Sequence, residues 1–135
     1  MDLCRAKGFD GIVPDNLISY LHDTGFNITA DDQLNFDKWV FNEAHSRNLS
    51  IGLLNDEDHV EELIPYIDWA MIEACYHFNT CQRYTPVIQA GKAVFDIEYT
   101  DNGTTLAQFC PTTQALQISG ILKHEFIDTY REACR

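Results

Sequence analysis

Five short apolar runs along the chain are each followed at once by polar side chains that could do chemistry. In chain order these polar residues are Asp15-Asn16, Asn55-Asp56, Glu73, Glu98-Tyr99 and Lys123-His124. Paired carboxylates are the groups used in glycoside hydrolysis, because one acid protonates the leaving oxygen while the other attacks the sugar or activates water. Asp15 and Glu73 follow different runs, so we expect them to face each other across a cleft as such a pair.

The apolar runs must be neighbouring parallel strands if these side chains are to meet. The expected strands cover residues 10–14, 49–54, 69–72, 93–97 and 118–122, and the expected helices cover 3–7, 34–47, 57–67, 81–90, 111–116 and 125–133. Strands that alternate with helices and are apolar on both faces are typical of a parallel sheet covered by helices. In such α/β folds the carboxyl ends of the strands carry the site. At any one position the alternative is that a strand end simply meets water.

The longest expected helix follows Thr29, whose hydroxyl suits the position that caps a helix N-terminus. Its first turn contains acidic residues, which the helix dipole favours. Phe36, Trp39 and Phe41 have helical spacing within it, so we expect all three in the core.

Net charge limits the classes of partner. The chain of 135 residues carries a net charge of -12, from 21 acidic and 9 basic residues. Such a surface repels nucleic acid and anionic membranes and attracts a cationic partner, although solubility alone would also explain it.

No apolar run approaches the length of a membrane span, and the first ten residues lack the apolar segment of a signal peptide. Neither a nucleotide-binding glycine motif nor a metal-ligand spacing of histidines occurs, so no cofactor or metal is expected.

The cysteines favour an oxidising environment. The five cysteines are Cys4, Cys75, Cys81, Cys110 and Cys134, and their spacing is not that of a zinc site. Four of them could form two bridges, which leaves one over. Three N-x-S/T sequons, at Asn27, Asn48 and Asn102, point weakly in the same direction, towards an extracellular protein.

Several longer stretches resemble one known family. They are AKGFDGIVPDN at 6–16, HDTGFNITADDQ at 22–33, IGLLND at 51–56, IEACYHFNTC at 72–81 and GKAVFDIEY at 91–99. In this order they are similar to the domain of glycoside-hydrolase family 114, the endo-α-1,4-polygalactosaminidases. The resemblance implies a secreted (β/α)8 TIM barrel that cuts α-1,4-linked, partly deacetylated galactosamine polymers. Such a polymer is cationic, so it would be a partner that fits the acidic surface.

The resemblance also implies roles for individual residues. Asp15 and Glu73 are the expected catalytic pair, with Glu73 as the acid and Asp15 as the nucleophile or base. The positions expected to line or support the sugar site are Asp10, Asn16, Asn55, Asp56, Glu98 and Tyr99. Asp10 precedes its strand, so its support would come through backbone hydrogen bonds. The expected disulfides are Cys75–Cys81 and Cys110–Cys134, with Cys4 left unpaired.

The chain departs from the family pattern in three ways. Val13 stands where an acid is expected, and Leu54 stands where a lysine is expected. A barrel of this kind has about eight strands, whereas only five are expected here. Residues 1–135 are therefore expected to be a single incomplete domain, truncated at its N-terminus and made of the C-terminal five βα units. The alternative to a hydrolase is an inactive carbohydrate-binding or non-functional remnant, and open barrel edges would allow self-association.

Overall fold

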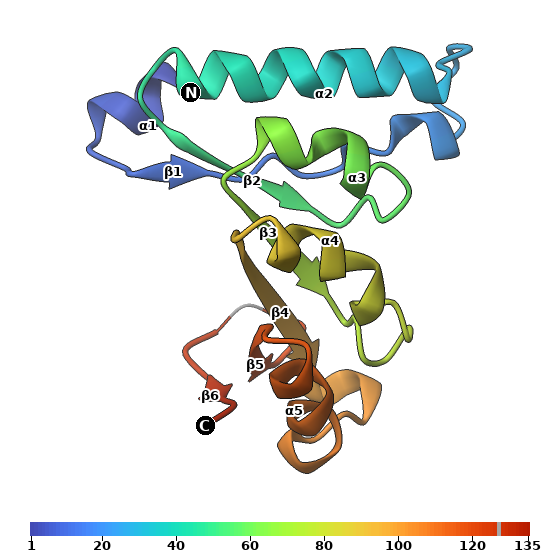
Figure 1. The fold of residues 1–135 in the computed structure, drawn as a ribbon, viewed down its shortest axis with the longest axis vertical. Helices are drawn as coiled ribbons and strands as arrows, with labels where there is room; N and C mark the ends of the chain where they lie inside the picture. Colours follow the sequence, from blue (N-terminus) through green and yellow to red (C-terminus); the bar gives the residue numbers. More distant parts are fainter. Residues whose placement is uncertain (127) are drawn as a thin grey trace.

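A six-stranded sheet runs through the molecule, and its strands are neighbours in the same order as in the chain (Figure 1). The computed structural model describes residues 1–126 and 128–135. The strands are β1 (Gly11–Ile12), β2 (Ser50–Leu54), β3 (Trp69–Glu73), β4 (Ala93–Tyr99), β5 (Ser119–Lys123) and β6 (Glu132–Ala133). Strands β1 to β5 are parallel, and β6 pairs antiparallel with β5. The expected parallel βα architecture is therefore confirmed.

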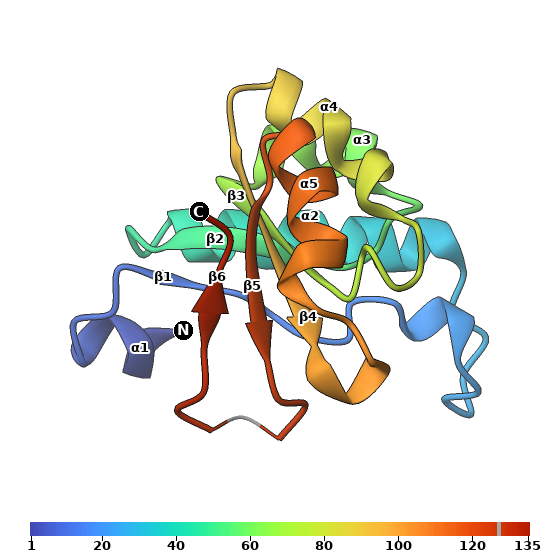
Figure 2. The same cartoon turned by 90° about the horizontal axis from the view of Figure 1, so that it is seen from below.

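Helices follow the first four strands and cover one face of the sheet, and one short helix precedes β1. They are α1 (Asp2–Ala6), α2 (Ala30–His45), α3 (Val60–Leu63), α4 (Thr85–Gln89) and α5 (Leu106–Ala115), with single 3-10 turns at Ser19–Leu21, Ile64–Tyr66, Cys81–Tyr84 and Thr100–Asn102. Figures 1 and 2 show α2 to α5 on the same side of the twisted sheet. None of the helices within the described residues has the length and apolar character that crossing a membrane requires.

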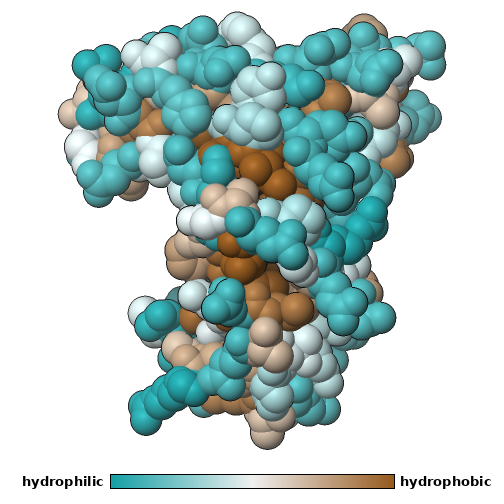
Figure 3. All heavy atoms as spheres, viewed as in Figure 1, coloured by the Kyte–Doolittle hydropathy of each residue, from teal (hydrophilic) through white to brown (hydrophobic). Residues whose placement is uncertain are grey.

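The two faces of the sheet differ in burial. On β3, Ala70 and Ile72 point towards the helices and are fully buried, whereas Met71 and Glu73 on the opposite face are half-buried. The same alternation continues on β4 and β5. The main core therefore lies between the sheet and α2 to α5. In the surface view of Figure 3, hydrophobic side chains reach the visible face mainly in the middle of the molecule. Because side chains alternate along a strand, residues at the strand ends are also divided between these two faces.

Helix α2 is capped as the sequence predicts, but its buried stripe is not the expected one. The Thr29 hydroxyl accepts a hydrogen bond from the Asp32 N–H, and the Asp32 carboxylate accepts one from the Thr29 N–H. Phe41 is fully buried, but Phe36 and Trp39 are 51% and 57% exposed, so their expected place in the core is wrong. The reason is that polar residues one helical turn apart, which hydrogen-bond to each other, occupy the inward face instead.

The expected helix at 125–133 is also wrong, since this segment contains β6. The C-terminus is drawn against β5 by the Cys110–Cys134 disulfide and by the Cys134 N–H, which donates to the Gly120 carbonyl (3.0 Å). The Lys123 ammonium donates to the main-chain carbonyls of Asp128 and Tyr130, which organises the turn before β6. Residue 127 of the expected helix lies outside the described residues.

Candidate active site

Glu73, at the carboxyl end of β3, is the centre of a hydrogen-bonded cluster. The Tyr99 hydroxyl donates to its Oε1 (2.5 Å), and the Asn55 side-chain amide donates to its Oε2 (3.3 Å). The Glu73 N–H donates in turn to the Asn55 Oδ1 (3.0 Å). Three residues expected from sequence at three different strand ends are therefore brought together, and both oxygens of the Glu73 carboxyl group are held by neutral donors.

The register of the sheet explains this convergence. Glu73 is opposite Ile97 on β4, so Tyr99 lies two residues further along on the same face of the sheet. Asn55 follows β2 and continues its pairing with β3, because its N–H donates to the Met71 carbonyl (3.0 Å). Burial and the hydrogen bond to Glu73 raise the pKa of the Tyr99 hydroxyl, which keeps it protonated as a donor.

The chain turns sharply on either side of this cluster. Asn55 and Asp56 both have φ near +57°, and Ala74, directly after Glu73, has φ +56°. Asparagine and aspartate tolerate this left-handed conformation better than other residues with a Cβ, whereas alanine does not. Strain of this kind persists only where the surroundings fix the backbone, and it is enriched at functional sites.

Asp15 and Asn16 lie at the same edge of the sheet, beyond β1, and both are exposed. The Asp15 Oδ1 accepts a hydrogen bond from the Asn16 N–H (2.7 Å), and Asn16 has φ +59°. Because β1 is separated from β3 by one strand, the two strands are roughly 10 Å apart. The described residues show no hydrogen bond between Asp15 and Glu73. Asp10, also exposed, supports β1 through its carbonyl, which accepts from the Ser50 N–H (2.9 Å).

Asp56 and Glu98 are placed away from the Glu73 cluster. Asp56 is only 3% exposed, and both its oxygens are bonded to the His59 Nδ1 at 3.0 and 3.1 Å. Burial raises the pKa of Asp56, which the adjacent His59 partly opposes. Glu98 is fully buried on the helix-facing side of β4, the opposite side from Tyr99. In this conformation neither carboxyl group is exposed at the strand edge around Glu73.

Lys123, opposite Tyr99 in the sheet register, reaches the same edge from β5. Its ammonium is occupied by two main-chain carbonyls, so it is a structural group in this conformation. His124 is half-exposed, bonds to the Asp128 carboxylate (2.7 Å) and stacks on the Tyr130 ring.

Both disulfides are those that the family resemblance implied. Cys75–Cys81 closes the loop that follows Glu73, and Cys110–Cys134 joins α5 to the C-terminus. Cys4 forms no disulfide within the described residues. Cys75, Cys81 and Asp96 are the described residues whose potential metal-ligand atoms cluster, within 4.8 Å of one another. Because the two sulfurs are bonded to each other, they are not available as thiolate ligands.

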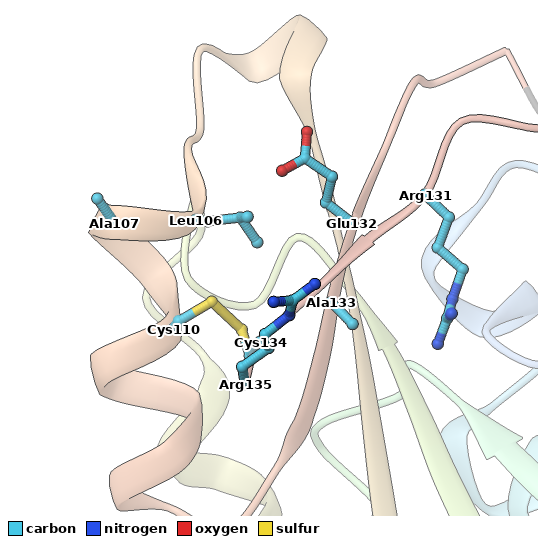
Figure 4. Close-up of a pocket in the computed structure, with 8 residues that line it drawn as sticks. All are labelled: Leu106, Ala107, Cys110, Arg131, Glu132, Ala133, Cys134 and Arg135. Carbon is cyan, nitrogen blue, oxygen red and sulfur yellow. A yellow bond between two sulfur atoms is a disulfide. The ribbon is translucent and has the colours of Figure 1, made fainter.

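A separate hollow of about 570 Å³ lies between α5 and β6, away from the Glu73 cluster (Figure 4). Its walls are made by Leu106, Ala107, Cys110, Arg131, Glu132, Ala133, Cys134 and Arg135. None of the residues expected for catalysis or sugar binding belongs to it, so the candidate active site is the open strand edge around Glu73.

Two solved structures are similar in fold to this chain. The crystal structure of Aspergillus fumigatus Ega3 in complex with galactosamine matches with a TM-score of 0.89 and 34% sequence identity, over 98% of this chain and 57% of the Ega3 chain. A variant of the glycoside hydrolase domain of PelA from Pseudomonas aeruginosa matches with a TM-score of 0.72 at 10% identity, over 98% of this chain and 60% of that one. The PelA match shows the fold alone.

The chain thus spans less than two thirds of either solved structure. No curated protein matches the sequence. The profile of glycoside-hydrolase family GH114 matches residues 1–135, the whole of the chain. With the parallel βα fold and the match to Ega3, this shows that the chain belongs to glycoside-hydrolase family GH114.

Proposed function

We propose that this chain supplies the catalytic edge of a glycoside hydrolase that cleaves α-1,4-linked, galactosamine-containing polysaccharide. The observation that carries the proposal is the Glu73 carboxyl group, held at a strand end by Tyr99 and Asn55. Membership of family GH114 supports the reaction class, and the galactosamine bound in the Ega3 structure supports the sugar.

Asp15 and Glu73 are the proposed carboxylate pair. Glu73 donates a proton to the glycosidic oxygen as the bond to the anomeric carbon breaks, and Asp15 attacks that carbon or takes a proton from the attacking water. Tyr99 and Asn55 orient Glu73 before the transfer and stabilise the carboxylate that remains after it, since both donate to its oxygens.

The substrate class follows from charge. A partly deacetylated galactosamine polymer carries ammonium groups, and the chain carries a net charge of -12. An acidic surface raises the local concentration of such a polymer and speeds its encounter with the site, an effect that salt weakens. An extracellular location fits the two disulfides and a polymeric substrate.

The second candidate function is binding of the amino-sugar polymer without cleavage. It is favoured by Asp15, whose exposed side chain lies outside the hydrogen-bonded cluster around Glu73 within the described residues.

The sheet also ends in β1 on one side and β6 on the other, so we propose that these edges allow self-association, which would bring further groups to the site.

The test is release of new reducing ends from a partly deacetylated α-1,4-galactosamine polymer. We expect Asp15→Asn and Glu73→Gln each to lower the rate at least about 1,000-fold, because each removes one of the two groups that the chemistry needs. Glu62→Gln, at an exposed position on α3, is the matched control and should retain the wild-type rate. Retention of the polymer on an affinity column without new reducing ends would identify the binding function instead. Undiminished turnover in either site variant would exclude the proposed pair.

A further inference from the structure

Two carboxylic acids on β4 lie fully buried directly behind the Glu73 loop. Asp96 and Glu98 are two residues apart, so their side chains point to the same, helix-facing side of the strand. Both have zero exposed surface, which is rare for acidic side chains without a charged partner. Neither has a lysine or arginine among its hydrogen-bond partners in the described residues.

Both acids bind the main chain of the segment that follows Glu73. The Asp96 Oδ1 accepts from the Cys75 N–H (3.3 Å), and the Glu98 Oε1 accepts from the Tyr76 N–H (2.6 Å). These two N–H groups come immediately after Ala74, which has φ +56°, and the Cys75–Cys81 disulfide closes the same loop. The pair therefore fixes the backbone that leads out of Glu73, while Asn55 fixes the Glu73 N–H on the other side.

The remaining oxygens of the pair are the decisive feature. The Asp96 Oδ2 and the Glu98 Oε2 are buried and have no hydrogen-bond partner in the described part of the chain if both groups are ionised. Two unpaired buried charges two residues apart would be very costly, whereas one proton placed between them turns the two free oxygens into a donor and an acceptor. The Asp96 and Glu98 side chains leave the same face of β4 two residues apart, and hydrogen bonding between the two carboxyl groups is one of the causes that raise the pKa of Asp96.

The surroundings of the pair keep that proton in place up to near neutral pH. Burial, followed by the charge of Glu98, raises the pKa of Asp96 to about 7, and burial also raises the pKa of Glu98. The groups that oppose the rise in the pKa of Glu98 are the Tyr76 and His77 N–H groups, the Thr104 hydroxyl and the His77 imidazole. Tyr99 points to the other face of β4, and the covering disulfide does not titrate.

We propose that Asp96 and Glu98 share one proton and, by holding the loop that follows β3, act as positioning residues for the Glu73 carboxyl group. The positioning role rests on the proposed function, whereas the shared proton does not. Loss of the proton leaves two like charges against each other and releases the loop, so Glu73 loses its fixed place between Asn55 and Tyr99.

The shared proton is tested by NMR titration of the backbone amides of Cys75 and Tyr76 between about pH 5 and pH 8.5. In the wild-type chain both amide signals should shift with one common midpoint near neutral pH, because both N–H groups donate to the titrating pair. Asp96→Asn, whose amide supplies the hydrogen permanently, should remove that step. Asp31→Asn, at an exposed position on α2, should leave it unchanged. A step that persists in Asp96→Asn would overturn the shared proton.

Positioning is tested with Asp96→Ala, which removes the hydrogen bond to the loop. The 13C signal of the Glu73 carboxyl group should shift or broaden in this variant and return towards wild type in Asp96→Asn, whether or not the chain hydrolyses polymer. Where hydrolysis is measurable, kcat should fall by about 100-fold with KM within about 2-fold, as expected for a misplaced catalytic group, and Asp96→Asn should restore most of the loss. An unchanged Glu73 signal in Asp96→Ala overturns the positioning role. A wild-type chain that cleaves nothing refutes the proposed function instead, and both NMR readouts still decide the inference.

Discussion

Asp37 is a buried acid whose effect on the free energy of unfolding can be measured directly. It lies on α2 with no exposed surface, and its Oδ1 accepts a hydrogen bond from the Gln33 side-chain amide (2.7 Å). Its Oδ2 is buried without a partner among the described residues. Burial raises the pKa of Asp37 from 3.8 to about 6; the charge of Asp56 adds to the rise, while Gln33 and His59 oppose it.

The sign and the size of the effect on stability follow from linkage. Because the folded state holds the Asp37 proton more tightly than the unfolded chain, the stabilisation is complete below about pH 4 and is lost as the pH rises through about 6. A difference between 3.8 and about 6 corresponds to about 3 kcal/mol, since each pKa unit is worth about 1.4 kcal/mol. Above pH 7 the wild-type chain therefore carries an ionised, partly unpaired carboxylate in its core.

Asp37→Asn removes this dependence, because an amide is neutral at every pH and still accepts from Gln33. Relative to wild type, the free energy of unfolding of Asp37→Asn should rise by about 2.5 kcal/mol between pH 4 and pH 7.5, since at pH 4 the unfolded carboxyl group is already partly ionised, and this corresponds to roughly 10 °C in melting temperature. Urea unfolding followed by tryptophan fluorescence at a series of pH values measures the difference. Because the variant is compared with wild type at each pH, the separate titration of Asp96 cancels.

Asp31→Asn is the matched control, since Asp31 is exposed in the first turn of the same helix. It should destabilise the chain slightly at neutral pH, by about 0.3–1 kcal/mol, because it removes a charge that the helix dipole favours. If the difference between Asp37→Asn and wild type is the same at pH 4 and pH 7.5, the buried carboxyl group titrates normally and the reasoning about burial is wrong.

Two further predictions concern the framework around the site. Replacing both Cys110 and Cys134 by Ser removes a disulfide between residues 24 positions apart and should lower the free energy of unfolding by roughly 3 kcal/mol. Cys4→Ser is the control and should change the free energy of unfolding little. Equal urea midpoints for the two variants would contradict this prediction. Gly52→Ala would place a Cβ 2.5 Å from the Trp69 ring and should lower the free energy of unfolding by about 1–3 kcal/mol. If crowding is the cause, the same substitution should lower it less in a Trp69→Leu background.

The convergence of Glu73, Asn55 and Tyr99 could be predicted because it depends on a local pattern. Apolar runs separated by helices predict a parallel sheet, and parallel strands carry their carboxyl ends to one edge. The same pattern contains a signal that the prediction for Glu98 did not use. Adjacent residues on a strand point to opposite faces, so Glu98 and Tyr99 lie on different faces of β4, and Tyr99 shares the face of Glu73.

The interior of α2 could not be predicted in the same way. Hydrophobic spacing favours Phe36 and Trp39 as core residues, yet Gln33 and Asp37 occupy the inward face. Gln33 and Asp37 bond to each other, and Gln33 also accepts from the Ser19 N–H outside the helix. Whether a polar residue is buried depends on such partners, which hydrophobic spacing alone does not reveal. The antiparallel β6 was missed for a similar reason, because a disulfide and backbone hydrogen bonds to β5 fix it, rather than local propensity.

The turn after β2 connects the candidate site to this buried cluster. Asn55 and Asp56 are consecutive and share the left-handed conformation, which directs one side chain to Glu73 and the other to His59. The ring of His59 in turn lies 5.2 Å from that of Tyr20 and close enough to Asp37 to affect its charge. Because Asn55 and Asp56 are adjacent in one turn, we expect a change that disturbs the Asp56–His59 pair to shift Asn55 as well. We therefore expect the position of Glu73 to depend on the buried Asp56 as well as on the proposed pair of acids on β4.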